Sequence, residues 1–241
     1  MPKNYYQNLL VIDIETVSAT EKFNDLPERL KPLWEYKSTF IKNDEELSPE
    51  ELFFKRGAIY AEFGKIVCIS AGFFHQLENG EYQFRVTAFA SDDEKKLLMD
   101  FIQLLNKFSQ KDIRFVAHNG KEFDFPYLCR RMLVHGIQLP ESLDIGEKKP
   151  WEVKHIDTME MWKFGDKKSY TSLELLSAIF DIESSKKGMD GSMVNDAYYI
   201  DKDLGKIAEY CIADVVVTAQ LYLRLNLLPF IKEENIKIVT S

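Results

Sequence analysis

The feature that most limits how this 241-residue chain can fold is a short apolar run, Leu9 to Ile12, that leads directly into the acidic tripeptide Asp13-Ile14-Glu15. An apolar run of this length is typical of a buried strand. Side chains two positions apart in a strand point to the same side, so Asp13 and Glu15 project together while Ile14 faces the opposite layer. We therefore expect a central strand that ends in two mutually repelling carboxylates, a place where a hard divalent cation would relieve the repulsion.

Further apolar segments predict the rest of the sheet. Strands over Lys65 to Phe74 and Tyr82 to Phe89 are joined by a turn at Asn79-Gly80, as in a hairpin. The later strands alternate with helical segments, which supply the crossovers that parallel strands need. We therefore predict an α/β fold with a mixed five-stranded sheet and helices on both faces. The later strands are predicted over Arg114 to His118 and Val153 to Asp157, and the helices over Ser91 to Leu105, Phe123 to His135, Leu173 to Phe180 and Asp203 to Leu228.

A charged segment with several prolines, residues 18–63, interrupts this pattern. Within it, Ser48 and Glu51 flank a proline in a capping-box arrangement, which predicts a helix start. A second capping box is predicted over Ser91 to Glu94. We expect one domain covering 1–241 with a partly helical insertion at about 18–63, and the place of this insertion directly after the first acids suggests a lid or a guide for a substrate.

Composition restricts the class of protein. The formal net charge of −8 argues against a passive nucleic-acid coat protein, which needs a basic face. It leaves room for an enzyme that binds cations, since two divalent ions would raise the charge to −4 (−8 + 2 × 2). Cys68, Cys129 and Cys211 form no CxxC pair and are expected to be buried thiols in a reducing compartment. With no signal-peptide pattern and no apolar run of about 20 residues, we expect a cytoplasmic protein without a membrane span.

A third acid stands where the fourth strand is predicted to turn into a helix. Asp124 follows Asn119-Gly120 and precedes Pro126, which places it at the helix start. An aspartate there is ordinarily a cap that stabilises the helix by about 1 kcal/mol. Phe123 and Tyr127 lie four apart and offer surfaces for base stacking, although packing in the core is the favoured alternative.

The fourth acid, Asp214, occupies an apolar stretch of the last predicted helix. No other charge occurs from Ile212 to Gln220, and Tyr210 lies one turn before Asp214 on the same edge. A buried carboxylate without a partner costs several kcal/mol. We therefore expect Asp214 to be neutral, paired across the fold, or bound to a metal ion.

In this order the motifs resemble those of a known superfamily. Asp-Ile-Glu-Thr from Asp13, Asn-Gly-x-x-Phe-Asp-x-Pro-Tyr-Leu from Asn119 and Tyr-x-x-x-Asp from Tyr210 resemble the three exonuclease motifs of the DEDD (DnaQ-like) superfamily. They are most similar to the proofreading exonuclease domain of family-B DNA polymerases and to stand-alone predicted exonucleases related to it. The resemblance spans most of the chain. Because tyrosine stands four residues before Asp214, and Glu209 five before it, the chain is similar to the tyrosine (DEDDy) branch.

The resemblance implies a ribonuclease H-like fold and two divalent cations, Mg²⁺ or Mn²⁺, as cofactors. Tyr210 would orient the attacking water, because a phenol with an unperturbed pKa near 10 is a poor base at neutral pH. Asp157 is expected near the site as an outer-shell acid or as a helix cap, and we favour the cap. The implied metal ligands are Asp13, Glu15, Asp124 and Asp214, and the implied substrate-binding residues are Thr16, Asn119 and Phe123.

The implied activity is a 3′-5′ exonuclease that releases nucleoside 5′-monophosphates from single-stranded or frayed DNA 3′ ends. An exoribonuclease of the same superfamily is the alternative, because nothing in the motifs reports on tolerance of a 2′-hydroxyl. A catalytically silent nucleic-acid-binding module is less favoured, since all four acids and the tyrosine are present.

Overall fold

A computed structural model describes residues 5–108, 113–166, 170–185 and 188–239. Six strands form one sheet in the order β5-β4-β1-β2-β3-β6. The pairs β1–β2 and β2–β3 are antiparallel, whereas β1–β4, β4–β5 and β3–β6 are parallel. The five predicted strands are all present, the fifth reduced to two residues, and a short sixth strand extends the edge beside β3. The strands are β1 (Leu9–Ser18), β2 (Gly64–Gln76), β3 (Tyr82–Ala90), β4 (Arg114–Ala117), β5 (Ile156–Asp157) and β6 (Ile236–Ile238).

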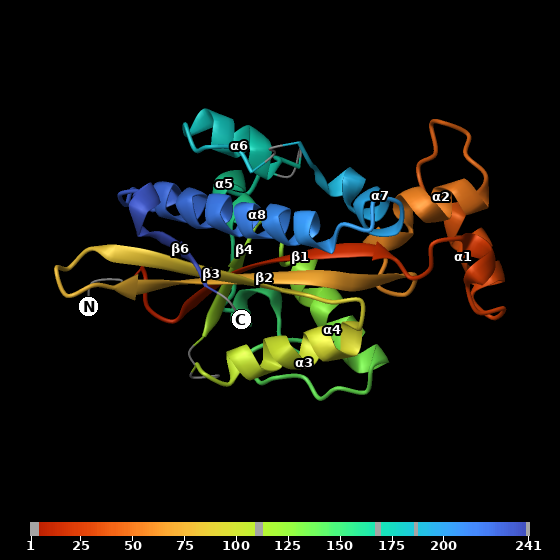
Figure 1. Cartoon of the computed structure of the whole chain (residues 1–241), viewed down its shortest axis with the longest axis horizontal. Helices are drawn as coiled ribbons and strands as arrows, with labels where there is room; N and C mark the ends of the chain where they lie inside the picture. Colours follow the sequence, from red (N-terminus) through yellow and green to blue (C-terminus); the bar gives the residue numbers. More distant parts are fainter. Residues whose placement is uncertain (1–4, 109–112, 167–169, 186–187, 240–241) are drawn as a thin grey trace.

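Helices cover both faces of this sheet, as predicted (Figure 1). On one face lie α3 (Glu94–Leu105) and α4 (Asp124–Val134), and on the other the long helix α8 (Leu204–Leu225) crosses β1, β2 and β3. Three shorter helices pack against α8: α5 (Thr158–Lys163), α6 (Leu173–Ile179) and α7 (Val194–Tyr199). Single-turn 3₁₀ segments are η3 (Pro150–Glu152), η4 (Gly191–Met193) and η5 (Glu233–Asn235).

Strand β1 separates two hydrophobic cores by simple alternation. Leu10 and Ile12 pack into the core that includes α3 and α4, whereas Leu9 and Val11 pack against Val215 and its neighbours on α8. These β1 residues are at most 2% exposed, which is why the run is apolar throughout. The alternation continues along the strand and decides which layer each later side chain of β1 enters.

The segment between β1 and β2 is partly helical and lies at one end of the sheet (Figure 1). It contains η1 (Phe23–Asp25), α1 (Lys31–Ser38), α2 (Pro49–Arg56) and η2 (Gly57–Ile59). Trp34 and Phe53 are fully buried at the centre of a small core of its own. The predicted capping box is confirmed: Ser48 Oγ accepts from Glu51 N at 3.3 Å, and Glu51 Oε2 accepts from Ser48 N at 2.8 Å.

The capping box predicted over Ser91 to Glu94 is wrong. Asp93 caps α3 instead, accepting from Lys96 N at 3.0 Å. Glu94 turns inward, where it accepts from the main-chain N–H of Ile66 at 2.7 Å and pairs with Arg131 at 2.6 Å. In this position Glu94 links β2 to α4 and gains a buried ion pair with Arg131, which an exposed capping box does not offer.

No helix in the described part of the chain is long and apolar enough to cross a membrane.

Candidate functional site

Asp13 and Glu15 stand on the face of β1 that meets α8. They follow Leu9 and Val11 in the alternation, and Ile14 between them is buried in the opposite core. The strand pairing places Glu15 opposite Cys68 of β2, and a bulge follows between Glu15 and the next residue. The two carboxylates therefore enter the layer between the sheet and α8, as predicted.

Helix α8 brings a thiol to this acidic pair. Cys211 Sγ lies 3.3 Å from Asp13 Oδ2, and one ligand atom from each of Asp13, Glu15 and Cys211 lies within 4.8 Å of the others. Burial and a hydrogen bond with Cys68 raise the pKa of Cys211, so its S–H acts as a donor to Asp13. We did not predict this residue as part of the site. The only signal was its position, directly after Tyr210 in the third motif.

Asp124 reaches the acidic pair from the other side of β1. Its Oδ1 accepts from the main-chain N–H of Ile14 at 3.1 Å, and the side chain is only 3% exposed. The N-cap of α4 is Phe123, which makes no side-chain cap. The sequence had left open that Asp124 caps α4, but it does not act as the N-cap. Its carboxylate instead accepts a hydrogen bond from β1.

The end of β4 makes room for this contact. The carbonyl of Asn8 points toward β4 and accepts from Arg114 N at 2.8 Å, and main-chain groups of every second residue of a strand point the same way. The N–H of Ile14 thus points toward the line of β4, but β4 ends at Ala117 and leaves the donor open. Asp124 fills the place that a continued strand would occupy.

The four acids interact electrostatically. Burial, followed by the negative charges of Glu15, Asp214 and Asp124, raises the pKa of Asp13 well above its usual range. Burial and the charge of Asp214 do the same to Glu15. Burial raises the pKa of Asp124 to about 7, although hydrogen bonds from its own N–H and from the N–H of Ile14 act against this. The predicted metal ligands therefore form one coupled group, and bringing their charges together is costly without a counter-charge.

Tyr210 is half-buried on α8 beside this group. Burial raises its pKa, and the charges of Asp214, Glu15 and Asp13 raise it further, together with a hydrogen bond to Asp214. The phenol is therefore protonated at any physiological pH and serves as a hydrogen-bond donor. This agrees with the positioning role expected for it.

The donor set fits divalent cations. Glu15 is 7% exposed, and within the described part of the chain its carboxylate makes no hydrogen bond or ion pair. A buried carboxylate surrounded by other carboxylates is either protonated or stabilised by a strong local positive charge. Oxygen ligands of this kind suit Mg²⁺ and Mn²⁺.

Asp157 fixes the loop that precedes Asp124. It caps α5 by accepting from Met159 N at 2.9 Å, which confirms the favoured prediction. Its two oxygens also accept from the main-chain N–H groups of Asn119 at 3.0 Å and Lys121 at 3.1 Å. Asp157 therefore caps α5 and also ties the loop of Asn119 and Lys121 to that helix. Asn119 has a left-handed conformation with φ of 62°.

The three predicted substrate-binding residues differ in their burial and in their contacts. Asn119 Oδ1 is buried and has no hydrogen-bond partner among the described residues. Thr16 Oγ1 donates to the carbonyl of Ala58 at 3.0 Å. Phe123 is half-buried and packs on Tyr127, which is 1% exposed and belongs to the core, as favoured.

Tyr170 is a second residue that we did not predict. Its ring packs edge-on against His118, with centroids 6.4 Å apart, and remains 64% exposed. After burial, the charges of Asp124 and Asp157 contribute most to raising the pKa of its phenol, which places the hydroxyl within electrostatic reach of the site. No motif surrounds it, so the sequence offered no signal.

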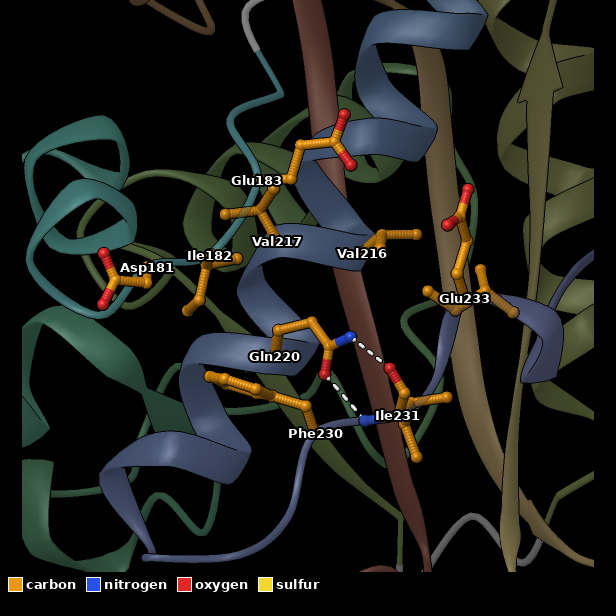
Figure 2. A pocket seen from close by; sticks show the side chains of 10 residues that line it. Asp181, Ile182, Glu183, Val216, Val217, Gln220, Phe230, Ile231 and Glu233 are labelled. Carbon is orange, nitrogen blue, oxygen red and sulfur yellow. Dashed lines mark hydrogen bonds between the residues drawn. The ribbon is translucent and has the colours of Figure 1, made fainter.

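A separate hollow lies on the outer side of α8, between the Asp181–Glu183 loop and the C-terminal segment (Figure 2). Gln220 closes part of it, donating to Ile231 O at 2.8 Å and accepting from Ile231 N at 3.0 Å. Among the described residues that line the hollow, none is a predicted site residue. We therefore treat it as a separate feature of the surface.

Known proteins match both the sequence and the fold. A family model described as a predicted 3′-5′ exonuclease related to the exonuclease domain of PolB matches residues 59–234, a range that includes Asp124, Tyr210 and Asp214 but begins after Asp13 and Glu15. Two sequences of DNA polymerase 1, from Pyrococcus abyssi and from its strain GE5 / Orsay, are each 26% identical over 140 residues. These alignments cover 53% of the chain and 18% of each polymerase.

The fold is similar to a solved structure, that of the family B DNA polymerase from the hyperthermophilic archaeon Pyrobaculum calidifontis. The TM-score is 0.52 at 13% identity, covering 91% of the chain and 24% of the polymerase. The predicted ribonuclease H-like fold is thereby confirmed. The chain thus spans less than a quarter of the polymerases it matches.

Proposed function

Because the chain belongs to the family of predicted 3′-5′ exonucleases related to the exonuclease domain of PolB, we propose that it shortens DNA strands from the 3′ end and releases nucleoside 5′-monophosphates. The observation that carries this proposal is the group of coupled acids around Glu15, a buried carboxylate with no hydrogen bond to the described chain. Such a group is expected where divalent cations bind, and it is difficult to explain as a structural feature.

Asp13, Glu15, Asp124 and Asp214 would hold the cations, two of them, as Mg²⁺ or Mn²⁺. When bound, these ions supply charge neutralisation, activation of a water molecule and stabilisation of the leaving 3′-oxygen. Asp13 and Glu15 are fixed by the strand, and Asp124 is fixed by its bond to Ile14 N. The protein thus prepares the ligands before substrate arrives.

Tyr210 would donate its phenolic hydrogen to the attacking water and hold it in line with the terminal phosphodiester. Its raised pKa keeps that hydrogen in place. The oxygen that Asn119 leaves without a partner would accept from the terminal nucleotide, beside Thr16 and the half-exposed ring of Phe123. These three residues would bind and orient the strand without taking part in bond making.

We propose single-stranded or frayed DNA as the substrate because the relatives named above are DNA polymerases. The insertion between β1 and β2 would guide this strand. Its η2 segment presents the carbonyl of Ala58 to both Thr16 and Tyr127, at 3.0 and 2.9 Å, so the insertion is anchored to the wall of the site. The unpaired thiols of all three cysteines support a place in the cytoplasm.

The test is cleavage of 5′-labelled DNA and RNA oligomers with Mg²⁺ or Mn²⁺. We expect a ladder of DNA products shortened stepwise from the 3′ end, and loss of that ladder in Asp214→Asn. Glu209→Gln removes an exposed acid from the same helix and should cleave like the wild type. A ladder from RNA alone would reassign the substrate. Absence of cleavage with either polymer and either metal would leave a silent binding module as the explanation.

A further inference from the structure

A cysteine sulfur lies beside the two acids of β1, Asp13 and Glu15. Cys211 is fully buried, and its Sγ lies 3.3 Å from Asp13 Oδ2. One carboxylate oxygen of Asp13, one of Glu15 and the sulfur of Cys211 all lie within 4.8 Å of one another. Two oxygens and one sulfur thus converge on one point from β1 and α8.

These separations match a coordination shell. For a tetrahedral zinc ion with Zn–S of about 2.3 Å and Zn–O of about 2.1 Å, the sulfur and oxygen ligands lie about 3.6 Å apart. The observed 3.3 Å between Cys211 Sγ and Asp13 Oδ2 differs from this by a few tenths of an ångström. The side chains would need only a small adjustment to accept an ion.

The chemistry of this donor set differs from that of an all-oxygen site. Mg²⁺ and Ca²⁺ prefer oxygen, whereas thiolate sulfur favours borderline and soft ions such as Zn²⁺, Co²⁺ and Cd²⁺. Glu15 makes no competing hydrogen bond with the described residues and so is available as a ligand. Cys68, opposite Glu15 in the strand pairing, is a second buried thiol and is hydrogen-bonded with Cys211.

We propose that Asp13, Glu15 and Cys211 form a mixed carboxylate–thiolate site that binds a borderline divalent cation such as Zn²⁺ or Co²⁺ through a metal–sulfur bond. On binding, the S–H bond of Cys211 breaks, its proton passes to solvent, and the hydrogen bond to Asp13 is replaced by coordination of both groups to the ion. A cation held in this way occupies the ligands that the nuclease reaction needs.

This inference rests on the proposed function only in using the same two acids. It is tested on the protein without nucleic acid, so its failure is distinguishable from failure of the nuclease. Titration of the full chain with Co²⁺ under a thiol-free reductant should produce a sulfur-to-cobalt charge-transfer band in the near ultraviolet. Cys211→Ser should lose that band and bind Co²⁺ more than about tenfold more weakly, equivalent to about 1.4 kcal/mol.

Cys129→Ser is the matched control, because Cys129 lies on α4 against the opposite core and donates to the carbonyl of Leu143. It should retain the band at full intensity. If Cys68→Ser lost the band and Cys211→Ser kept it, the sulfur ligand would be Cys68, and the proposal would be overturned. Cobalt bound with no charge-transfer band in the wild type would overturn it as well.

A measurement on the unmodified protein covers the case in which Cys211→Ser does not fold. X-ray absorption at the zinc edge of the Zn²⁺-loaded wild type should require one sulfur at about 2.3 Å. A shell of oxygen and nitrogen alone would refute sulfur ligation, while leaving the carboxylates as cation ligands and the proposed nuclease intact.

Discussion

The main-chain N–H of Ile14 donates to Oδ1 of Asp124 at 3.1 Å, across a separation of 110 residues in the chain. The donor lies between the two acids of β1, so a single hydrogen bond joins the first and second acidic motifs. It also fixes the orientation of the Asp124 carboxylate beside the acids of β1.

Substitution of Asp124 should separate this structural contact from the chemistry. Asp124→Asn keeps an acceptor for Ile14 N and should fold like the wild type, yet lose cleavage by about a thousandfold or more. Asp124→Ala leaves the buried N–H unsatisfied, which costs about 1–3 kcal/mol, partly offset by relief of repulsion. Thermal unfolding and cleavage of labelled DNA measure the two effects. Glu122→Gln, an exposed neighbour, is the control, and a wild-type rate in Asp124→Asn would contradict our assignment of the metal ligands.

Asp157 should be a larger contributor to stability than an ordinary cap. Asp157→Ala removes the acceptor of the N–H groups of Asn119, Lys121 and Met159, which we expect to cost about 3 kcal/mol or more. Asp203→Ala removes the exposed cap of α8 and should cost about 1 kcal/mol. Urea unfolding compares the two. Equal losses in the free energy of unfolding would mean that the bonds of Asp157 to Asn119 and Lys121 add nothing to its cap.

Tyr210→Phe should lower kcat on the order of a hundredfold, because the water loses its orienting donor, while Mn²⁺ binding is retained. Burial and the neighbouring acids raise the pKa of Tyr210, so we expect the phenol to stay protonated between pH 7 and 9. The pH dependence of kcat over that range should therefore have the same shape in both proteins. A limb present in the wild type and missing from Tyr210→Phe would identify the tyrosine as a base.

His155 should make stability depend on pH below neutrality. The ring is buried, its Nδ1 accepting from Phe115 N at 3.3 Å and its Nε2 donating to Ser142 O at 2.9 Å, so the neutral form is required. Burial lowers the pKa of His155 to about 4, against an unfolded value near 6.5. A depressed pKa gives stability that is complete above pH 6.5 and is lost as pH falls toward 4.

Between pH 7 and pH 5 this residue should contribute a loss of about 2 kcal/mol in the free energy of unfolding. The glutamine of His155→Gln does not titrate in this range. The free energy of unfolding of this variant should therefore fall by about 2 kcal/mol less than that of the wild type, even if the variant is less stable at pH 7. His75→Gln, at an exposed position on β2, should follow the wild type. Urea unfolding at both pH values measures the difference, and parallel losses in wild type and His155→Gln would exclude the proposed cause.

The sequence was sufficient for elements whose information is local. The apolar run of β1, the hairpin of β2 and β3 and the cap at Ser48 follow from periodicity and turn chemistry, and all are present. The box at Ser91 was wrong because Glu94 has better partners in Arg131 and Ile66, which only the fold brings near. Contacts of this kind override local preference.

The site was predictable to the same degree. The motifs singled out four acids, and the fold brings these four within electrostatic reach of one another. They could not indicate Cys211, whose approach to Asp13 depends on how α8 crosses β1, nor Tyr170, which reaches the site from a loop. The bond between Ile14 and Asp124 was equally hidden, since a main-chain donor leaves no trace in residue identity.

The early end of β4 has a consequence for how this architecture could be lost. Had the strand run two residues further past Ala117, one of its carbonyls would accept from the N–H of Ile14 in place of Asp124, and the carboxylate would be displaced. The proposed catalytic centre therefore depends on an interruption in the sheet, and an insertion that completed the β1–β4 ladder would be expected to abolish the proposed activity.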